Sequence, residues 1–81
     1  MRIEVRLFAV AKELAGGPTV GVELPEPASV GSLRSALGDR FPALKPLLRG
    51  MRLAVGHEYV GDDTTLGPGD EVALIPPVSG G

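Results

Sequence analysis

Residues 72–77 read Val72-Ala73-Leu74-Ile75-Pro76-Pro77, and the rest of the chain can be arranged around them. Four consecutive apolar residues give a β-strand that has no polar face, which is typical of a strand in the middle of a sheet. The two prolines that follow have no backbone N–H to donate to a neighbouring strand. We therefore predict a central strand over residues 71–75 and an extended segment after it.

Two further strands are predicted near the beginning of the chain. Apolar and polar side chains alternate over residues 2–8, which is the pattern of a strand with one buried face. A second alternating stretch covers residues 19–24. Between them, residues 9–15 are rich in helix formers and are followed by Gly16-Gly17-Pro18, a typical end of a helix. We expect a short helix after the first strand.

The main helix is predicted over residues 30–41, with Ser29 as its N-cap. Apolar residues recur there at helical spacing and would form one buried stripe. The stripe consists of Val30, Leu33, Ala36, Leu37 and Phe41. Pro42 and Pro46 are predicted to end the helix. The leucines at 44, 47 and 48 are then expected in a loop or short turn that covers the edge of the core.

The second half of the chain predicts a hairpin and the central strand. Residues 51–55 and 58–60 are strand-like, and Gly56-His57 between them is a two-residue turn signal. Residues 61–65 and 67–70 are predicted as turns. Placing the first and last strands side by side, with the main helix across one face, gives an α+β fold. We expect a mixed sheet of four to five strands.

Length and composition exclude several classes of protein. The chain has 81 residues, no cysteine, one histidine and a net charge of −2. Its size predicts one domain. The negative charge is the wrong sign for a protein that binds nucleic acid or an anionic membrane, so neither is an expected partner. No apolar run is long enough to cross a bilayer, and the first residues do not resemble a signal peptide. We expect a soluble, cytoplasmic protein.

No group of residues in the sequence indicates catalysis by this chain alone. Asp62-Asp63 and Asp70-Glu71 lie in predicted turns, where carboxylates commonly bond to nearby backbone. His57 is expected at the tip of a hairpin, facing solvent without an orienting partner. The glycine clusters do not match a phosphate-binding pattern.

The last six residues are the most informative candidate site. Pro76-Pro77 favours an extended segment, and Val78-Ser79 is modest in size. Gly80-Gly81 has no side chains, so it could enter a channel only as wide as the backbone. An arm of this kind is suited to chemical alteration of the Gly81 carboxylate. The alternative interpretation is a frayed terminus.

At this point the sequence resembles the small subunits of molybdopterin synthase, which are ubiquitin-like β-grasp sulfur carriers. The resemblance covers essentially the whole chain. It is carried by Leu7-Phe8-Ala9, Lys12-Glu13-Leu14, Ala54-Val55, Tyr59-Val60, Leu66, Gly69-Asp70-Glu71-Val72 and the ending Ile75-Pro76-Pro77-Val78-Ser79-Gly80-Gly81. A terminal Gly-Gly is shared by ubiquitin-like modifiers, whereas the longer ending is more specific.

The resemblance implies a β-grasp domain over residues 1–75 and an extended tail over residues 76–81. It implies that an E1-like enzyme uses ATP to adenylate the Gly81 carboxylate, and that a sulfur donor then displaces AMP to leave a thiocarboxylate. In the synthase, the tail would enter the large subunit and donate sulfur to cyclic pyranopterin monophosphate. This chain itself would bind no cofactor, and the catalytic groups would belong to its partners.

The resemblance also implies that Phe8, Tyr59 and Ile75 form an apolar patch that contacts the partners, with Lys12 beside it. Lys12 stands where many relatives carry arginine. Core packing is the alternative for each apolar residue. However, Phe8 follows the inward Leu7 and Ile75 follows the inward Leu74, so both are expected to point outward. Tyr59 would fit a core edge equally well.

Three other functions stay open. The same tail chemistry could deliver sulfur to the thiazole of thiamine or to 2-thiolated tRNA. A covalent protein modifier would instead join Gly81 to lysines of other proteins. A non-covalent binding module would have an inert tail.

Overall fold

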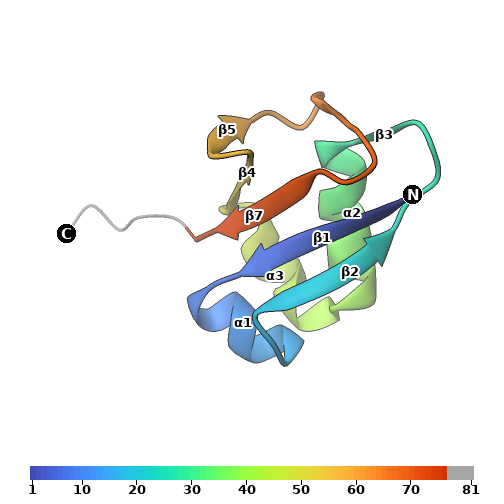
Figure 1. Cartoon of the computed structure of the whole chain (residues 1–81). Helices are drawn as coiled ribbons and strands as arrows, with labels where there is room; N and C mark the ends of the chain where they lie inside the picture. Colours follow the sequence, from blue (N-terminus) through green and yellow to red (C-terminus); the bar gives the residue numbers. More distant parts are fainter. Residues whose placement is uncertain (77–81) are drawn as a thin grey trace.

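In the computed structural model, which describes residues 1–76, a mixed sheet is covered on one face by helices (Figure 1). The strands of this sheet lie in the order β2-β1-β7-β4-β5. The elements are β1 (Arg2–Leu7), α1 (Ala9–Ala15), β2 (Thr19–Glu23), β3 (Ala28–Ser29), α2 (Val30–Arg40), the 3₁₀ turn η1 (Pro42–Leu44), α3 (Lys45–Leu48), β4 (Arg52–Val55), β5 (Glu58–Val60), β6 (Thr65–Leu66) and β7 (Glu71–Ile75). This is the predicted β-grasp arrangement.

The last strand occupies the centre of the sheet, as its apolar sequence predicts. It pairs in parallel with β1, where Val5 lies opposite Val72 and Leu7 opposite Leu74. On its other side it pairs antiparallel with β4. The first and last strands are therefore adjacent, and the intervening chain supplies the edge strands and the helical layer.

The core lies between the sheet and α2. Alternation along β1 and β7 turns one set of side chains toward the helices, and α2 contributes a stripe that packs on them. The largest fully buried side chains are Ile3, Val5, Leu7, Val30, Leu33, Leu37, Leu44, Leu53, Val72 and Leu74. The opposite face of the sheet is left without a covering layer among residues 1–76.

Helix α2 begins as predicted, because the Ser29 Oγ accepts a hydrogen bond from the Ser32 backbone N–H at 3.1 Å. It ends at Arg40, before Pro42. The prediction that Pro46 also ends this helix is wrong, since Pro46 lies in the first turn of α3. A proline is compatible with that position, where its missing N–H would have no helical partner.

The segment expected to be a loop or short turn is helical. It forms η1 and the single turn α3, which bury Leu44 and Leu48 and leave Leu47 half-buried. The prediction that these leucines cover the core edge is confirmed. The spacing of four residues between Leu44 and Leu48 places both on the same side of a helical turn.

Sequence periodicity missed a small second sheet. β3 and β6 pair antiparallel, although Ser29 was predicted only as a helix N-cap and residues 61–65 only as a turn. Strands of two residues are too short to show alternation. The strand bounds also differ slightly from the prediction, since β1 ends at Leu7 and β4 begins at Arg52.

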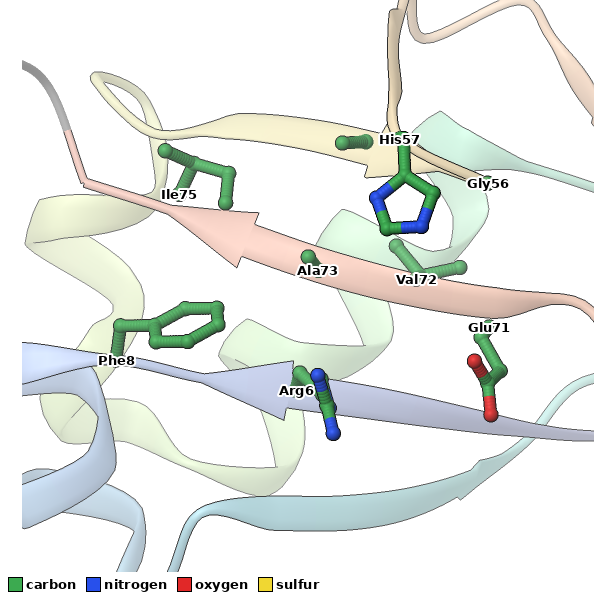
Figure 2. A pocket seen from close by; sticks show the side chains of 9 residues that line it. Arg6, Phe8, Gly56, His57, Glu71, Val72, Ala73 and Ile75 are labelled. Atoms are coloured by element: carbon green, nitrogen blue, oxygen red, sulfur yellow. The ribbon is translucent and has the colours of Figure 1, made fainter.

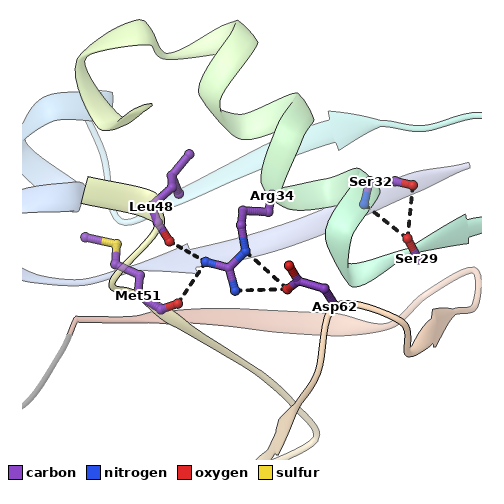
Figure 3. A network of polar contacts seen from close by, with 6 residues as sticks. All are labelled: Ser29, Ser32, Arg34, Leu48, Met51 and Asp62. Carbon is purple, nitrogen blue, oxygen red and sulfur yellow. Dashed lines mark hydrogen bonds and ion pairs between the residues drawn. The ribbon is translucent and has the colours of Figure 1, made fainter. Parts of the chain in front are cut away.

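Arg34 connects three separate segments (Figure 3). Its Nε and Nη2 donate to the Asp62 Oδ1 at 3.2 and 3.1 Å. Its Nη1 donates to the Met51 carbonyl at 2.8 Å and also to the Leu48 carbonyl. Asp62 was predicted only as a turn residue, and the ion pair adds a contact that spans 28 residues of sequence.

We expect Arg34→Ala to lower the free energy of unfolding by about 2 kcal/mol, because it removes charged donors from two backbone carbonyls. Asp62→Ala should lower the free energy of unfolding by less than about 1 kcal/mol. The Asp62 side chain is 60% exposed, so water can take its place beside the Arg34 guanidinium. Urea unfolding followed by circular dichroism measures both losses. Equal losses for the two variants would contradict a role for the carbonyl contacts.

Candidate functional site

The uncovered face of the sheet carries the strand side chains that alternate with those facing the core. The pairing register places four of them in one row across the sheet. Arg6 on β1 lies opposite Ala73 on β7, which lies opposite Ala54 on β4, which lies opposite Tyr59 on β5. Because the two middle residues are alanines, the row is low at its centre and high at its ends.

A shallow hollow of about 240 Å³ follows from this arrangement (Figure 2). We call it the sheet pocket. It is lined by Arg6, Phe8, Ala54, Gly56, His57, Glu71, Val72, Ala73 and Ile75. Figure 2 shows the Phe8 ring and the His57 imidazole on either side of Ala73. The pocket therefore has a small, apolar floor, with charged and aromatic groups at its margin.

Phe8 and Ile75 both border the sheet pocket, and neither belongs to the core. Phe8 is 43% exposed and Ile75 is half-buried. The chain turns sharply after Phe8, because Ala9 has a φ of 51°, a backbone conformation that few residues other than glycine adopt. The turn starts α1 directly after Phe8. Phe8 itself is still extended, so its side chain points away from the face of the core-facing Leu7.

Tyr59 lies on the same face but does not line the sheet pocket. It is 58% exposed, and the Arg52 guanidinium lies 5.1 Å from the centre of its ring. At this distance the cation and the ring attract each other. Of the two positions open from sequence, the structure gives Tyr59 the surface one rather than the core edge.

Lys12 lies on the exposed side of α1, next to the same end of the sheet. It lines a second hollow, with Arg6, Phe8 and Thr19 among its neighbours. This hollow adjoins the sheet pocket, since Arg6 and Phe8 line both. The structure thus brings Lys12 near Phe8, whereas Tyr59 lies on the edge strand β5.

The hairpin turn brings an unexpected residue to the site. Gly56 and His57 have φ values of 56° and 72°, as a tight two-residue hairpin requires. The predicted turn is confirmed and His57 is exposed, but its ring also lines the sheet pocket. Sequence reasoning missed this contact, because it depends on the pairing of β4 with β7 and has no local signal.

The tail begins beside the sheet pocket. Ile75 is the last residue of β7, and Pro76 follows it. The predicted tail residues Pro77, Val78, Ser79, Gly80 and Gly81 lie outside the described residues.

Among residues 1–76, the charged side chains of this face form one ion pair, between the Arg2 Nε and the Glu4 Oε1 at 2.8 Å. The hydrogen bond from Arg2 and the charge of Glu4 raise the pKa of the Arg2 guanidinium above its ordinary value. Arg6 forms no ion pair or hydrogen bond with another residue of the segment 1–76.

Within residues 1–76, no three His, Cys, Asp or Glu side chains gather as a metal ion would require. None of the helices in that range has both the length and the apolar character needed to span a membrane.

Known proteins are similar to this chain over its whole length, both in sequence and in structure. The sequence is 36% identical over 81 residues to the molybdopterin synthase sulfur carrier subunit of Arabidopsis thaliana, covering 100% of this chain and 84% of that protein. The structure matches SAMP1, a small archaeal modifier protein from Haloferax volcanii, with a TM-score of 0.87, 34% identity and full coverage of both chains.

A third match is a complex of subunits 1 and 2 of the molybdopterin-converting factor from Helicobacter pylori. Its TM-score is 0.72 at 27% identity, with 100% of both chains covered. These neighbours share the ubiquitin-like β-grasp fold. The model of the ThiS family matches residues 5–81. The chain therefore belongs to the ThiS family, and it is homologous to the sulfur carrier subunits of molybdopterin synthase.

Proposed function

We propose that this chain is the sulfur carrier subunit of a molybdopterin synthase. The observation that carries the proposal is the end-to-end similarity to such subunits from organisms as distant as a plant and a mammal. The family match extends to residue 81, so it covers the Gly-Gly ending.

The proposed chemistry takes place at the Gly81 carboxylate. A carboxylate is a poor electrophile, so one of its oxygens first attacks the α-phosphorus of ATP on an E1-like activating enzyme, and pyrophosphate leaves. Hydrosulfide released by a sulfur donor then attacks the acyl carbon, AMP leaves with the oxygen, and the thioacid loses its proton. The product is a C-terminal thiocarboxylate, which gives its sulfur to cyclic pyranopterin monophosphate on the large subunit. ATP is bound by the activating enzyme and not by this chain.

The residues of the tail suit this task. Gly80 and Gly81 present only backbone, so the reacting carboxylate can pass through a narrow entrance. Pro76 and Pro77 favour an extended exit from β7, which holds the reacting end away from the sheet. Val78 and Ser79 lie between them and add little width.

Docking of the large subunit and of the activating enzyme is proposed to use Phe8, Ile75 and Tyr59. All three lie on the uncovered face of the sheet, and two of them lie next to the start of the tail. An exposed apolar patch of this kind is typical of an interaction site. Lys12 adds a positive charge at the same end. The Helicobacter complex of subunits 1 and 2 supports this choice of partner.

The first test is the mass of the C-terminal peptide after incubation with the activating enzyme, ATP and a sulfur donor. We expect one oxygen of Gly81 to be replaced by sulfur. The peptide must be isolated, because oxidation of Met1 or Met51 produces nearly the same change in the intact mass. A variant that lacks Gly80-Gly81 is the control. An unmodified tail, under conditions in which the same enzyme modifies another carrier, would overturn the proposal.

The docking patch is tested by Phe8→Gln, with Leu14→Gln as the matched control. The two side chains are 43% and 42% exposed, but Leu14 lines neither the sheet pocket nor the hollow beside Lys12. We expect Phe8→Gln to weaken binding of the large subunit by about 2 kcal/mol, as loss of a central aromatic anchor does. Leu14→Gln should leave it unchanged. Similar affinities for both variants, measured by calorimetry, would remove Phe8 from the patch.

The similarity to SAMP1 favours a second candidate function, that of a protein modifier. In that case Gly81 would form isopeptide bonds with lysines of other proteins. Immunoblots of cells that express the tagged chain would then show conjugates of high mass. These conjugates should disappear when Gly80-Gly81 is deleted.

A further inference from the structure

We infer that the sheet pocket receives one bulky apolar side chain of the large subunit, together with a carboxylate next to it. The inference rests on the proposed function for the identity of the partner. It identifies the chemistry that the partner must present at this face.

The floor of the pocket has space for an apolar group. Ala73 and Ala54 are the only small side chains of the cross-sheet row, and they lie between the larger Arg6 and Tyr59. The larger side chains of Phe8 and Ile75 border the two alanines, and the volume of the hollow is about 240 Å³. A side chain that entered would replace water over apolar surface on several sides, which is favourable. A polar occupant would find few partners on this floor.

Arg6 gives one side of the pocket margin a positive charge that can bind a carboxylate. Arg6 has no ion pair or hydrogen bond with residues 1–76, so its guanidinium can donate hydrogen bonds to both oxygens of a carboxylate. The His57 imidazole is a further possible donor from the other side of Ala73. Glu71 is the one acidic group that lines the pocket. A carboxylate is therefore expected on the Arg6 side, and Glu71 should oppose it weakly.

The position of the pocket connects it to the partner that takes the tail. Phe8 and Ile75 belong both to the proposed docking patch and to the pocket lining, and Ile75 directly precedes the tail. Lys12 and Arg52 lie at the same end of the sheet as Arg6. The chain as a whole has a net charge of −2, yet the end that would face the partner carries several cations. An acidic partner surface is complementary to this end.

The experiment is a calorimetric titration of the large subunit with four variants of the full chain. Ala73→Leu fills the pocket from its exposed side and should weaken binding at least about tenfold. Arg6→Gln should weaken it by about three- to tenfold and reduce its dependence on salt. Glu71→Gln should tighten it by about twofold, because a like charge is removed. Arg49→Gln, an exposed cation next to α3, is the control and should change little.

Thermal unfolding of each variant distinguishes loss of the pocket from loss of the fold. If Ala73→Leu and Arg6→Gln bind within twofold of the unaltered chain, the inference is wrong even though the proposed function stands. If Arg6→Gln and Arg49→Gln weaken binding equally, net charge is responsible rather than the pocket, and the inference is again overturned.

A small probe tests the pocket without the large subunit. N-acetyl-phenylalanine has the inferred pair of groups, and N-acetyl-phenylalanine amide lacks the carboxylate. In NMR titrations we expect the acid to shift the amide signals of Ala54, Ala73 and Phe8 at lower concentration than the amide does. Equal or absent shifts would contradict the inferred chemistry. Failure of the unaltered chain to bind the large subunit, with the probe result intact, would refute the proposed function instead.

Discussion

The parallel pairing of β1 with β7 is the constraint on which the rest of the structure depends. Parallel neighbours end at the same edge of a sheet, so the residue after β1 and the last residue of β7 must lie together. Those residues are Phe8 and Ile75, and the tail begins one residue later. The pairing therefore places Phe8, Ile75 and the start of the tail at one end of the molecule. It also requires contacts between the two ends of the chain, which are slow to form.

The two faces of the sheet carry different side chains, because successive side chains along each strand point to opposite faces. On β7, Val72 and Leu74 pack under α2, while Ala73 and Ile75 lie on the uncovered face. A central strand with apolar residues on both faces thus fills the core and also presents apolar side chains on the uncovered face. The uncovered face is hollow at Ala54 and Ala73, whose side chains are small, and it is raised at the larger Phe8. Shape on the outer face follows from side-chain size at fixed register positions.

Alternation and turn signals predicted the main sheet, α2 and its Ser29 cap, because each of these patterns extends over several residues. The η1–α3 segment and the β3–β6 pair were not predicted, since single turns and two-residue strands leave no periodic pattern. Outward positions for Phe8 and Ile75 followed from their inward neighbours. The Arg34–Asp62 contact and the place of His57 in the sheet pocket could not be predicted, because both join segments that only the tertiary structure brings together.

The central claim is that the tail of this chain carries sulfur to a pterin. A single-turnover reaction tests it most directly, with the large subunit, cyclic pyranopterin monophosphate and this chain prepared with a thiocarboxylate at Gly81. The dithiolene of molybdopterin contains two sulfur atoms, so the account predicts that two thiocarboxylates are consumed for each molybdopterin formed. A large subunit that makes molybdopterin with another carrier, but leaves the thiocarboxylate of this chain intact, would contradict it.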